Sequence, residues 1–238
     1  MTTATACAPA PATGPAALPD WCDLVTRAGR FTLAPVRPDR DLWRLHRWLN
    51  DPVVDEYWQL AGDLARVDGY LAEQRSRPHT RGYVARLSGR AIGYWELYRA
   101  ADDRLGGYYP ARPTDLGVHL LIGEADCRGI GLGAVLLEAL AESLQHGTDL
   151  RLVSEPDERN LPSVRAFTRA GFRRADTIAL PEKNAALMVR DPAEARRAGR
   201  APITGPGRSP RPSADAATPV GVPPRPRRTA EGLIRRGD

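Results

Sequence analysis

The chain has 238 residues and a net charge of +5, which is enough length for one good-sized core or two small ones. From Glu194 onward it carries ten arginines and four acidic residues, so this segment is at +6 and the rest is close to −1. No aromatic residue lies between these arginines, which argues against a nucleic-acid partner. No apolar run approaches the length of a membrane span, so none is expected.

Composition divides the chain into three parts. Residues 1–20 are mostly Ala, Pro and Thr, and residues 193–238 are rich in Pro, Arg, Gly and Ala. Both segments bury too little apolar surface to offset the entropy of ordering, so we expect disordered tails. Residues 21–192 are then a single globular domain. A basic segment followed by an apolar one is missing at the N-terminus, so a cytoplasmic location is the default expectation.

The first half of this domain predicts a strand, two helices and a hairpin. Apolar residues at helical spacing and capping residues mark the helices, and alternating apolar runs around a glycine turn mark the hairpin. The predicted elements are a strand at 31–36, helices at 39–49 and 63–76, and hairpin strands at 83–87 and 91–98.

The second half alternates strands and helices. Its predicted elements are strands at 116–122 and 150–154, helices at 134–145 and 164–170, and final strands at 172–180 and 185–189. The order predicts an α/β (α+β) domain with a mixed, mostly antiparallel sheet flanked by helices. No internal repeat is visible.

A glycine-rich turn opens the helix at 134–145. Its Gly129, Gly131 and Gly133 place backbone N–H groups at a helix N-terminus, which suits a phosphate or pyrophosphate. Gly129, Gly131 and Ala134 also fit the dinucleotide-binding pattern, with Glu155 near the place of a ribose-binding acid. Antiparallel strands before the turn, and too short a chain after it, argue against that interpretation. A turn needed only for tight packing is a further alternative.

The segment Arg128–Gly133 matches at each position the R/Q-x-x-G-x-G/A motif of the general N-acetyltransferase (GNAT) superfamily. This resemblance implies the GNAT fold, an acyl-coenzyme A co-substrate and no metal. It also implies that the amides of the turn hold the pyrophosphate and that a splayed strand lies along the pantetheine arm. By the same resemblance, residues of the later helix at 164–170, and Asn160 before it, line the coenzyme A channel. The coenzyme A residues so implied are Arg128, Gly129, Ile130, Gly131, Leu132 and Gly133 in the turn, Leu120, Leu121 and Ile122 on the strand, and Asn160, Arg165 and Phe167 after it.

A narrower resemblance covers about residues 31–191. Its phrases lie at 46–52, 57–58, 94–98, 117–123, 155–160, 170–172 and 180–183. Together they resemble the hydroxamate-siderophore acyltransferases, which include N6-hydroxylysine O-acetyltransferases, N-hydroxycadaverine acyltransferases and mycobactin-type lysine N-acyltransferases. The resemblance implies a small-molecule amine or hydroxylamine as acceptor.

By this resemblance, His119 and Asp157 are the catalytic pair. Acyl transfer needs a proton acceptor in the range where histidine titrates, and an aspartate could fix the histidine tautomer. A histidine hydrogen-bonded within the sheet, and an aspartate that merely caps a helix, are the structural alternatives.

Aromatic and acidic residues are expected to surround the acceptor. The acceptor-binding residues so predicted are His46, Trp48, Tyr57, Trp58, Trp95, Glu96 and Asp103. Trp48 fits a helix core equally well. Trp95 and Glu96 alternate on one strand, so only one of them faces a given side.

These observations predict an enzyme that acylates N6-hydroxylysine, N-hydroxycadaverine or lysine for a hydroxamate siderophore. One alternative is an N-acetyltransferase acting on another amine, such as an aminoglycoside. Another is a non-catalytic acyl-coenzyme A-binding scaffold. Nothing in the sequence predicts the oligomeric state.

Overall fold

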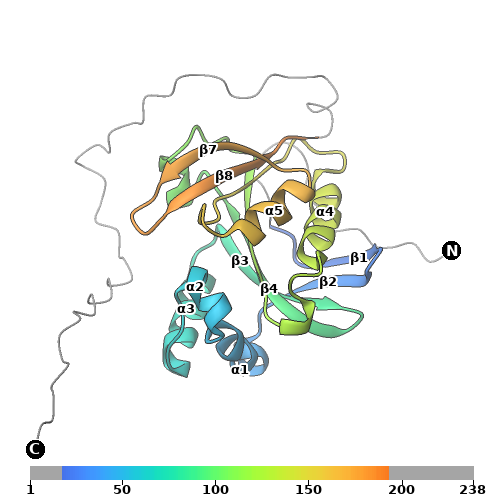
Figure 1. Ribbon diagram of the computed structural model, residues 1–238, viewed down its shortest axis with the longest axis vertical. Helices are drawn as coiled ribbons and strands as arrows, with labels where there is room; N and C mark the ends of the chain where they lie inside the picture. The colour runs from blue at the N-terminus through green and yellow to red at the C-terminus, as the bar shows by residue number, and fades with distance from the viewer. Residues whose placement is uncertain (1–17, 193–238) are drawn as a thin grey trace, which may run out of the picture. The chain divides into compact units, whose positions relative to one another are not determined.

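An eight-stranded sheet runs through the computed structural model, which describes residues 18–192 (Figure 1). Its strands, in sheet order, are β1 (Cys22–Thr26), β2 (Gly29–Pro35), β3 (Thr80–Leu87), β4 (Arg90–Arg99), β5 (Asp115–Ile122), β6 (Arg151–Ser154), β8 (Asn184–Arg190) and β7 (Arg173–Ala179). Neighbouring strands are antiparallel except β5 and β6, which are parallel. The predicted tails, residues 1–20 and 193–238, lie outside the described residues apart from 18–20.

Helices cover both faces of this sheet. They are α1 (Pro38–Leu49), α2 (Pro52–Trp58), α3 (Leu64–Ser76), α4 (Leu132–Gln145) and α5 (Leu161–Arg169), with short 3₁₀ turns η1 (Arg104–Gly107) and η2 (Ala125–Cys127). Aspartates cap two of them, since Asp51 accepts from the Val53 N–H and Asp63 from the Arg66 N–H. Gln59, in the left-handed region at φ 53°, ends α2.

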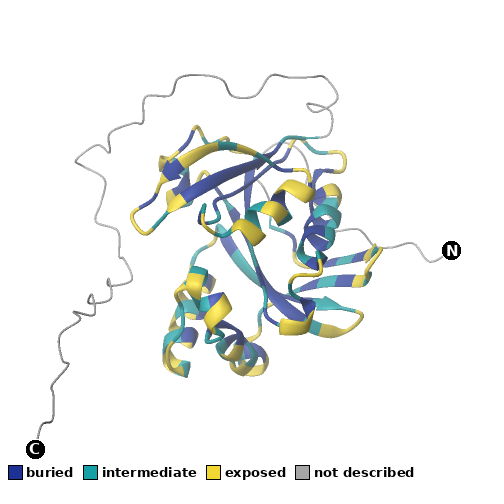
Figure 2. Ribbon diagram, in the orientation of Figure 1, coloured by how far each residue is buried: buried dark blue, intermediate teal, exposed yellow. Residues whose placement is uncertain are grey.

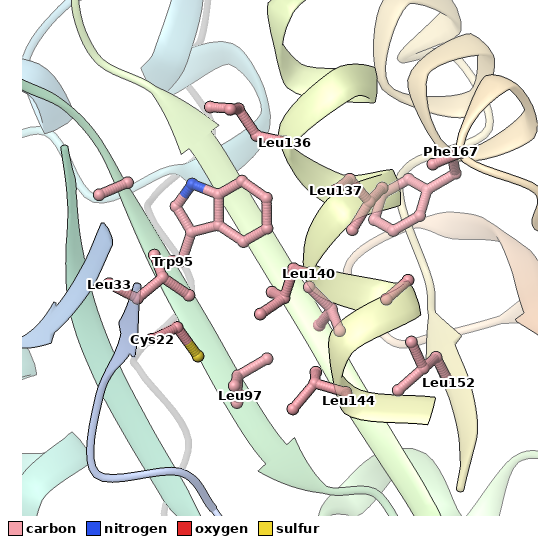
Figure 3. Packing of buried hydrophobic residues seen from close by; sticks show 14 of the residues in the cluster. Cys22, Leu33, Trp95, Leu97, Leu136, Leu137, Leu140, Leu144, Leu152 and Phe167 are labelled. Carbon is pink, nitrogen blue, oxygen red and sulfur yellow. The ribbon is translucent and has the colours of Figure 1, made fainter. Parts of the chain in front are cut away.

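The two faces pack against different helices. One apolar cluster joins Leu45, Trp48 and Leu71 of α1 and α3 to Tyr94 and Leu121 of the sheet. On the opposite face, α4 and α5 cover the larger cluster, which includes the labelled side chains of Figure 3. Figure 2 shows the result, a buried sheet between helices that expose their outer sides.

The contact between β5 and β6 is short. It pairs Asp115–Gly117 with Arg151–Val153 and ends there, so the strands separate beyond it. A fully buried ion pair fixes its start, because Arg151 Nε donates to Asp115 Oδ1 at 2.7 Å. The Tyr109 hydroxyl donates to the other Asp115 oxygen at 2.8 Å, so this buried carboxylate has several partners.

The predicted fold class is confirmed, with a mixed sheet flanked by helices in the expected order. Two elements were not predicted. Strand β1 is an edge strand with Val25 exposed and Asp23 paired to Arg30, so its alternation is weak. Helix α2 is seven residues long, too short for a helical period to stand out.

Candidate active site

The centre of the candidate site is His119, on β5 at the point where β6 has already diverged. Its Nε2 lies 2.6 Å from Glu155 Oε1, and its Nδ1 lies 3.2 Å from Glu96 Oε2. Glu96 is its cross-strand partner on β4, and Glu155 follows β6 directly. The Glu96 and Glu155 side chains are 4% and 6% exposed, whereas that of His119 is 33% exposed. The imidazole is therefore the reachable member of a buried carboxylate–imidazole–carboxylate cluster.

These carboxylates control the protonation of His119. Burial by itself lowers the pKa of the imidazole, but the charge of Glu155 and the hydrogen bonds to both carboxylates outweigh it and raise this pKa to about 10. For Glu155, burial raises the pKa, and the charge of His119 outweighs that effect and lowers it. At neutral pH His119 is thus an imidazolium held by the Glu155 carboxylate, with Glu96 at its second ring nitrogen.

Tyrosine hydroxyls complete the cluster. Tyr98 donates to Glu155 Oε2 at 2.6 Å and lies 3.2 Å from His119 Nε2. Tyr94 donates to Glu96 Oε1 at 2.7 Å, and Tyr70 of α3 donates to the same oxygen. Hydrogen bonds of this kind offset the cost of burying a carboxylate.

Aromatic residues of α2 reach the same place. The ring of Trp58 packs edge-on at 6.4 Å from His119 and at 5.7 Å from Tyr94. Burial, followed by the hydrogen bond to Glu56 and its charge, raises the pKa of Tyr57, and the charge of Asp157 adds a smaller contribution. The structure thus brings the predicted His119, Trp58 and Glu96 together.

Asp157 does not contact His119 as the sequence predicted. Its carboxylate binds Arg159, with Oδ1 accepting from the Arg159 N–H at 2.9 Å and from Arg159 Nε at 3.0 Å. The charge-assisted bonds to Arg159 lower the pKa of Asp157. The side chains of Glu155 and Asp157 are separated by one proline, and Glu155 is the one that orients the imidazole.

The glycine turn has the predicted form. Gly129 and Gly131 have φ of 74° and 82°, in the left-handed region that favours glycine. Gly131 is the N-cap of α4, and no side chain caps this helix. Among the described residues, no side chain therefore accepts a hydrogen bond from the first N–H groups of α4, at Leu132 and Gly133. These groups are available to an anion. Ile130, between the two glycines, is 72% exposed.

Arg128 stabilises this turn from inside. Its Nε donates to the Ile122 carbonyl at 2.8 Å, and one of its terminal nitrogens donates to the Gly123 carbonyl at 2.6 Å and to Asp51 at 2.8 Å. The guanidinium thus ties the end of β5 to α2, and a contact between Arg128 and coenzyme A stays a prediction.

The residues predicted beside the pantetheine arm divide between the two faces of β5. Leu120 and Ile122 are partly buried and approach Gly133, where a Cβ atom would lie 3.9 Å from each side chain. Leu121 points the other way and is buried against α1. Beyond Gly117 this edge of β5 has no ladder with β6, so the predicted splay is present.

Three predicted site residues belong to the core instead. Trp95 is fully buried beside Leu136 and Leu140 of α4 (Figure 3). It precedes Glu96 on β4 and so faces away from His119. Phe167 packs T-shaped against Phe172 at 5.0 Å. Trp48 is 1% exposed, with its Nε1 donating to Glu124 at 3.0 Å. In each case helical or strand periodicity explains the residue, and the ligand-binding prediction is corrected.

The remaining predicted residues have local partners or none. His46 Nε2 lies 3.0 Å from the Gly62 carbonyl, so it fastens the α2–α3 connection. Asp103 accepts from the Leu105 N–H and begins η1. Asn160 caps α5 by accepting from the Ser163 N–H at 3.1 Å. Arg165 is exposed on α5, and no ion pair involves it within residues 18–192.

Sequence reasoning missed four members of the cluster, namely Glu155 as a partner of His119, and the tyrosines Tyr70, Tyr94 and Tyr98. A signal for Tyr98 was present, because Tyr94, Glu96 and Tyr98 alternate on one face of β4. Tyr70 comes from α3, and only the packing of that helix brings it to Glu96.

No helix within residues 18–192 is long and apolar enough to cross a membrane. Within the same range, His, Cys, Asp and Glu side chains form no group that could hold a metal ion.

Comparison with known proteins gives consistent matches. The family described as "Acetyltransferase (GNAT) domain" matches residues 37–180. The N(6)-hydroxylysine O-acetyltransferase of Escherichia coli is 31% identical over 156 residues, which are 65% of this chain and 50% of that protein. The N-hydroxyputrescine acetyltransferase of Acinetobacter baumannii is 29% identical over 172 residues, or 72% and 82% of the two chains. This chain therefore spans half the length of the first relative and most of the second.

Among solved structures, an aminoglycoside acetyltransferase AAC(6')-Ib in complex with coenzyme A superimposes with a TM-score of 0.62 at 30% identity. The match covers 70% of this chain and 98% of that one. The proteins similar to this chain thus include both hydroxylamine and aminoglycoside acetyltransferases by name.

Proposed function

The chain belongs to the GNAT acetyltransferase family, and we propose that it transfers an acyl group from an acyl-coenzyme A to a hydroxylamine nitrogen. The acceptor is an N-hydroxylated diamine or N6-hydroxylysine. The observation that carries the proposal is the buried Glu96–His119–Glu155 cluster at the splay of β5 and β6. The product is a hydroxamate, as in siderophores. The predicted family and fold agree with the comparisons.

The residues around the splay fit a coenzyme A thioester. Uncapped N–H groups at Leu132 and Gly133 suit its pyrophosphate, and the open edge of β5 offers backbone groups to its pantetheine amides. When bound, acyl-coenzyme A supplies the activated carbonyl carbon. Asn160 and Arg165 stay proposed contacts of this co-substrate.

The reaction forms a bond between the acceptor nitrogen and the acyl carbon, breaks the carbon–sulfur bond, and moves one proton from nitrogen to sulfur. His119 is the group that carries this proton, since its side chain is reachable and its pKa is raised into a range where it stays protonated at rest. The imidazolium gives its proton to the departing thiolate and recovers one from the acylated nitrogen.

An imidazolium of this kind favours a weakly basic acceptor. A hydroxylamine nitrogen reaches the site neutral at pH 7, and it becomes acidic once it has attacked the carbonyl, so it needs no strong base beforehand. An alkylamine arrives as an ammonium ion and must first lose a proton. The raised pKa of His119 therefore supports hydroxylamine over alkylamine acceptors.

The site also favours a particular chemistry at the end of the acceptor that is away from the reacting nitrogen. The acidic side chains of Glu96 and Glu155 lie on either side of His119, beside the aromatic ring of Trp58. This environment attracts a cation and covers an alkyl chain, as an N-hydroxydiamine or N6-hydroxylysine provides. Asp157, next to Tyr57, keeps a proposed catalytic role on the acceptor side.

The test is a thiol-release assay with acetyl- and succinyl-coenzyme A and three acceptors, N-hydroxycadaverine, cadaverine and kanamycin. We expect kcat/KM for N-hydroxycadaverine to exceed that for cadaverine by at least about tenfold. A preference for kanamycin would instead place the chain with the aminoglycoside enzymes it resembles. Coenzyme A binding without turnover on any acceptor would favour the scaffold alternative.

A further inference from the structure

The buried hydroxyl of Tyr98 contacts both members of the closest pair in the candidate active site. It donates to Glu155 Oε2 at 2.6 Å and lies 3.2 Å from His119 Nε2, while Glu155 Oε1 lies 2.6 Å from the same nitrogen. The centroids of the Tyr98 and His119 rings are 4.7 Å apart. One oxygen of the carboxylate is therefore directed at the tyrosine, and the other at the imidazole.

Strand pairing does not fix the side chain of Glu155. This residue follows β6 directly, and the ladder between β5 and β6 has already ended at Val153. Among the described residues, its carboxylate hydrogen-bonds only to Tyr98 and His119. The side chain reaches from the end of β6 to β5, and a glutamate side chain is costly to order. The Tyr98 hydroxyl is therefore what restrains the carboxylate on the side away from the imidazole.

Gly117 leaves the space that the Tyr98 ring occupies. The two residues are cross-strand partners on β5 and β4. A Cβ atom at position 117 would overlap Cζ and Cε2 of the tyrosine ring. Gly117 is not among the glycines with a positive φ angle, so its backbone conformation does not require glycine. The position of the tyrosine ring explains this glycine, because the ring must cross β5 for its hydroxyl to reach Glu155.

Charged groups from several elements also act on the pair. Glu96 of β4 lies 3.2 Å from the other ring nitrogen of His119. The charge of Lys183, just before β8, favours the carboxylate form of Glu155, and Arg104 of η1 responds to the charge of the same carboxylate. Such charges act over a distance and impose little direction, whereas a hydrogen bond is directional. They therefore favour a charged Glu155 without deciding which way its carboxylate faces.

We propose that Tyr98 is a positioning residue, which holds the Glu155 carboxylate against His119 Nε2. Gly117 makes room for it. The hydroxyl fixes Oε2, so Oε1 stays directed at the imidazole while the imidazole gives up and recovers its proton. The importance of Tyr98 for turnover rests on the proposed function, whereas its effect on the imidazole does not. The competing explanation is that the hydroxyl only offsets the cost of burying a carboxylate.

NMR titration of the His119 ring in Tyr98→Phe, without co-substrate, distinguishes the two explanations. If the hydroxyl positions Glu155, the freed carboxylate turns away and the pKa of His119 falls from about 10 toward its ordinary value. If the hydroxyl only offsets burial, its loss leaves the charge of Glu155 unshared, and the pKa of His119 stays or rises. The matched control is Tyr109→Phe, which removes a buried hydroxyl from the Asp115 carboxylate and should leave this pKa unchanged. An unchanged or raised pKa in Tyr98→Phe would overturn the proposal.

A second variant moves the ring and keeps the hydroxyl. Gly117→Ala places a methyl group where the Tyr98 ring lies, so we expect the pKa of His119 to fall here too. Combined with Tyr98→Phe, it should give no further fall, because both changes remove the same contact. An additive effect of the two changes would contradict the proposal. If the alanine variant does not fold, the titration of Tyr98→Phe decides.

Steady-state kinetics extend the test to the proposed reaction. With N-hydroxycadaverine we expect Tyr98→Phe to lower kcat by about tenfold or more, because the proton-carrying group is misplaced, while KM for acetyl-coenzyme A is unchanged. A lowered pKa of His119 with an unaltered kcat would overturn the role of Tyr98 in turnover. A wild type that transfers no acyl group, with the fall in pKa still present in Tyr98→Phe, would refute the proposed function alone.

Discussion

The two faces of strands β4 and β5 differ in polarity, since one carries apolar side chains and the other carries charged ones. One face presents Trp95 and Leu97 to α4 (Figure 3). Val118 belongs to the same cluster, and all three are fully buried. The other presents Glu96 and His119, one residue away along the same strands. Because side chains alternate along a strand, two neighbouring residues serve different purposes.

The difference shows how the sheet holds charge near its core. The apolar face gains free energy from burial, at roughly 25 cal/mol per Å² of apolar surface. The polar face buries two carboxylates, which is costly unless they are paired and hydrogen-bonded. Tyr70, Tyr94 and Tyr98 supply those bonds. The first face should therefore decide stability and the second the chemistry.

Removal of the imidazole should separate the two faces most clearly. We expect His119→Ala to lower kcat by about 10²–10⁴-fold, the usual contribution of a proton-transferring group, while coenzyme A binding is unchanged. Steady-state kinetics and calorimetry measure the two quantities. His146→Ala is the matched control, since His146 is exposed at the C-terminal end of α4. Turnover that survives in His119→Ala would end the assignment of this residue.

Truncation on the apolar face should have the opposite pattern. Leu140 of α4 is fully buried in the large cluster. We expect Leu140→Ala to lower the free energy of unfolding by about 2–5 kcal/mol through lost burial and a cavity. Urea denaturation measures this change, and kcat per folded molecule should stay near the wild-type value. A proportionate loss of kcat would show that the two faces are not separable.

The sequence predicted the apolar face better than the polar one. Leu136, Leu140 and Leu144 recur at helical spacing, which any core helix requires. The glycine turn was predicted from its motif, and the positive φ angles of Gly129 and Gly131 explain why glycine stands there. By contrast, the choice of Glu155 over Asp157 beside His119 depends on how β6 ends and on the Arg159 side chain. No local pattern encodes such three-dimensional details.

Neutralising the closer carboxylate should change the pH dependence. In Glu155→Gln the pKa of His119 should fall from about 10 toward its ordinary value, because the largest favourable charge is removed. The limb of kcat/KM that depends on protonated His119 should move to lower pH, because the imidazolium is the active form in the proposed reaction. NMR titration of the imidazole measures the same pKa directly, and an unchanged pKa would contradict the pairing.

The same variant should reveal the contribution of the pair to stability. A raised histidine pKa stabilises the folded state fully below about pH 6.5, the ordinary value, and this stabilisation is lost as pH rises toward 10. The wild type should therefore exceed Glu155→Gln in unfolding free energy by more at pH 6 than at pH 10. Urea denaturation at the two pH values tests the sign, and a reversed order would contradict it.

The farther carboxylate should matter less to the imidazole. Glu96 lies 3.2 Å from Nδ1, against 2.6 Å for Glu155 and Nε2, and it also accepts from Tyr70 and Tyr94. Its charge is therefore shared among three donors, and we expect Glu96→Gln to lower the pKa of His119 by less than Glu155→Gln does. Tyr94→Phe is the control, because it removes one donor and keeps the carboxylate. A larger shift in Glu96→Gln would mean that the strand neighbour, rather than the residue after β6, sets the protonation of His119.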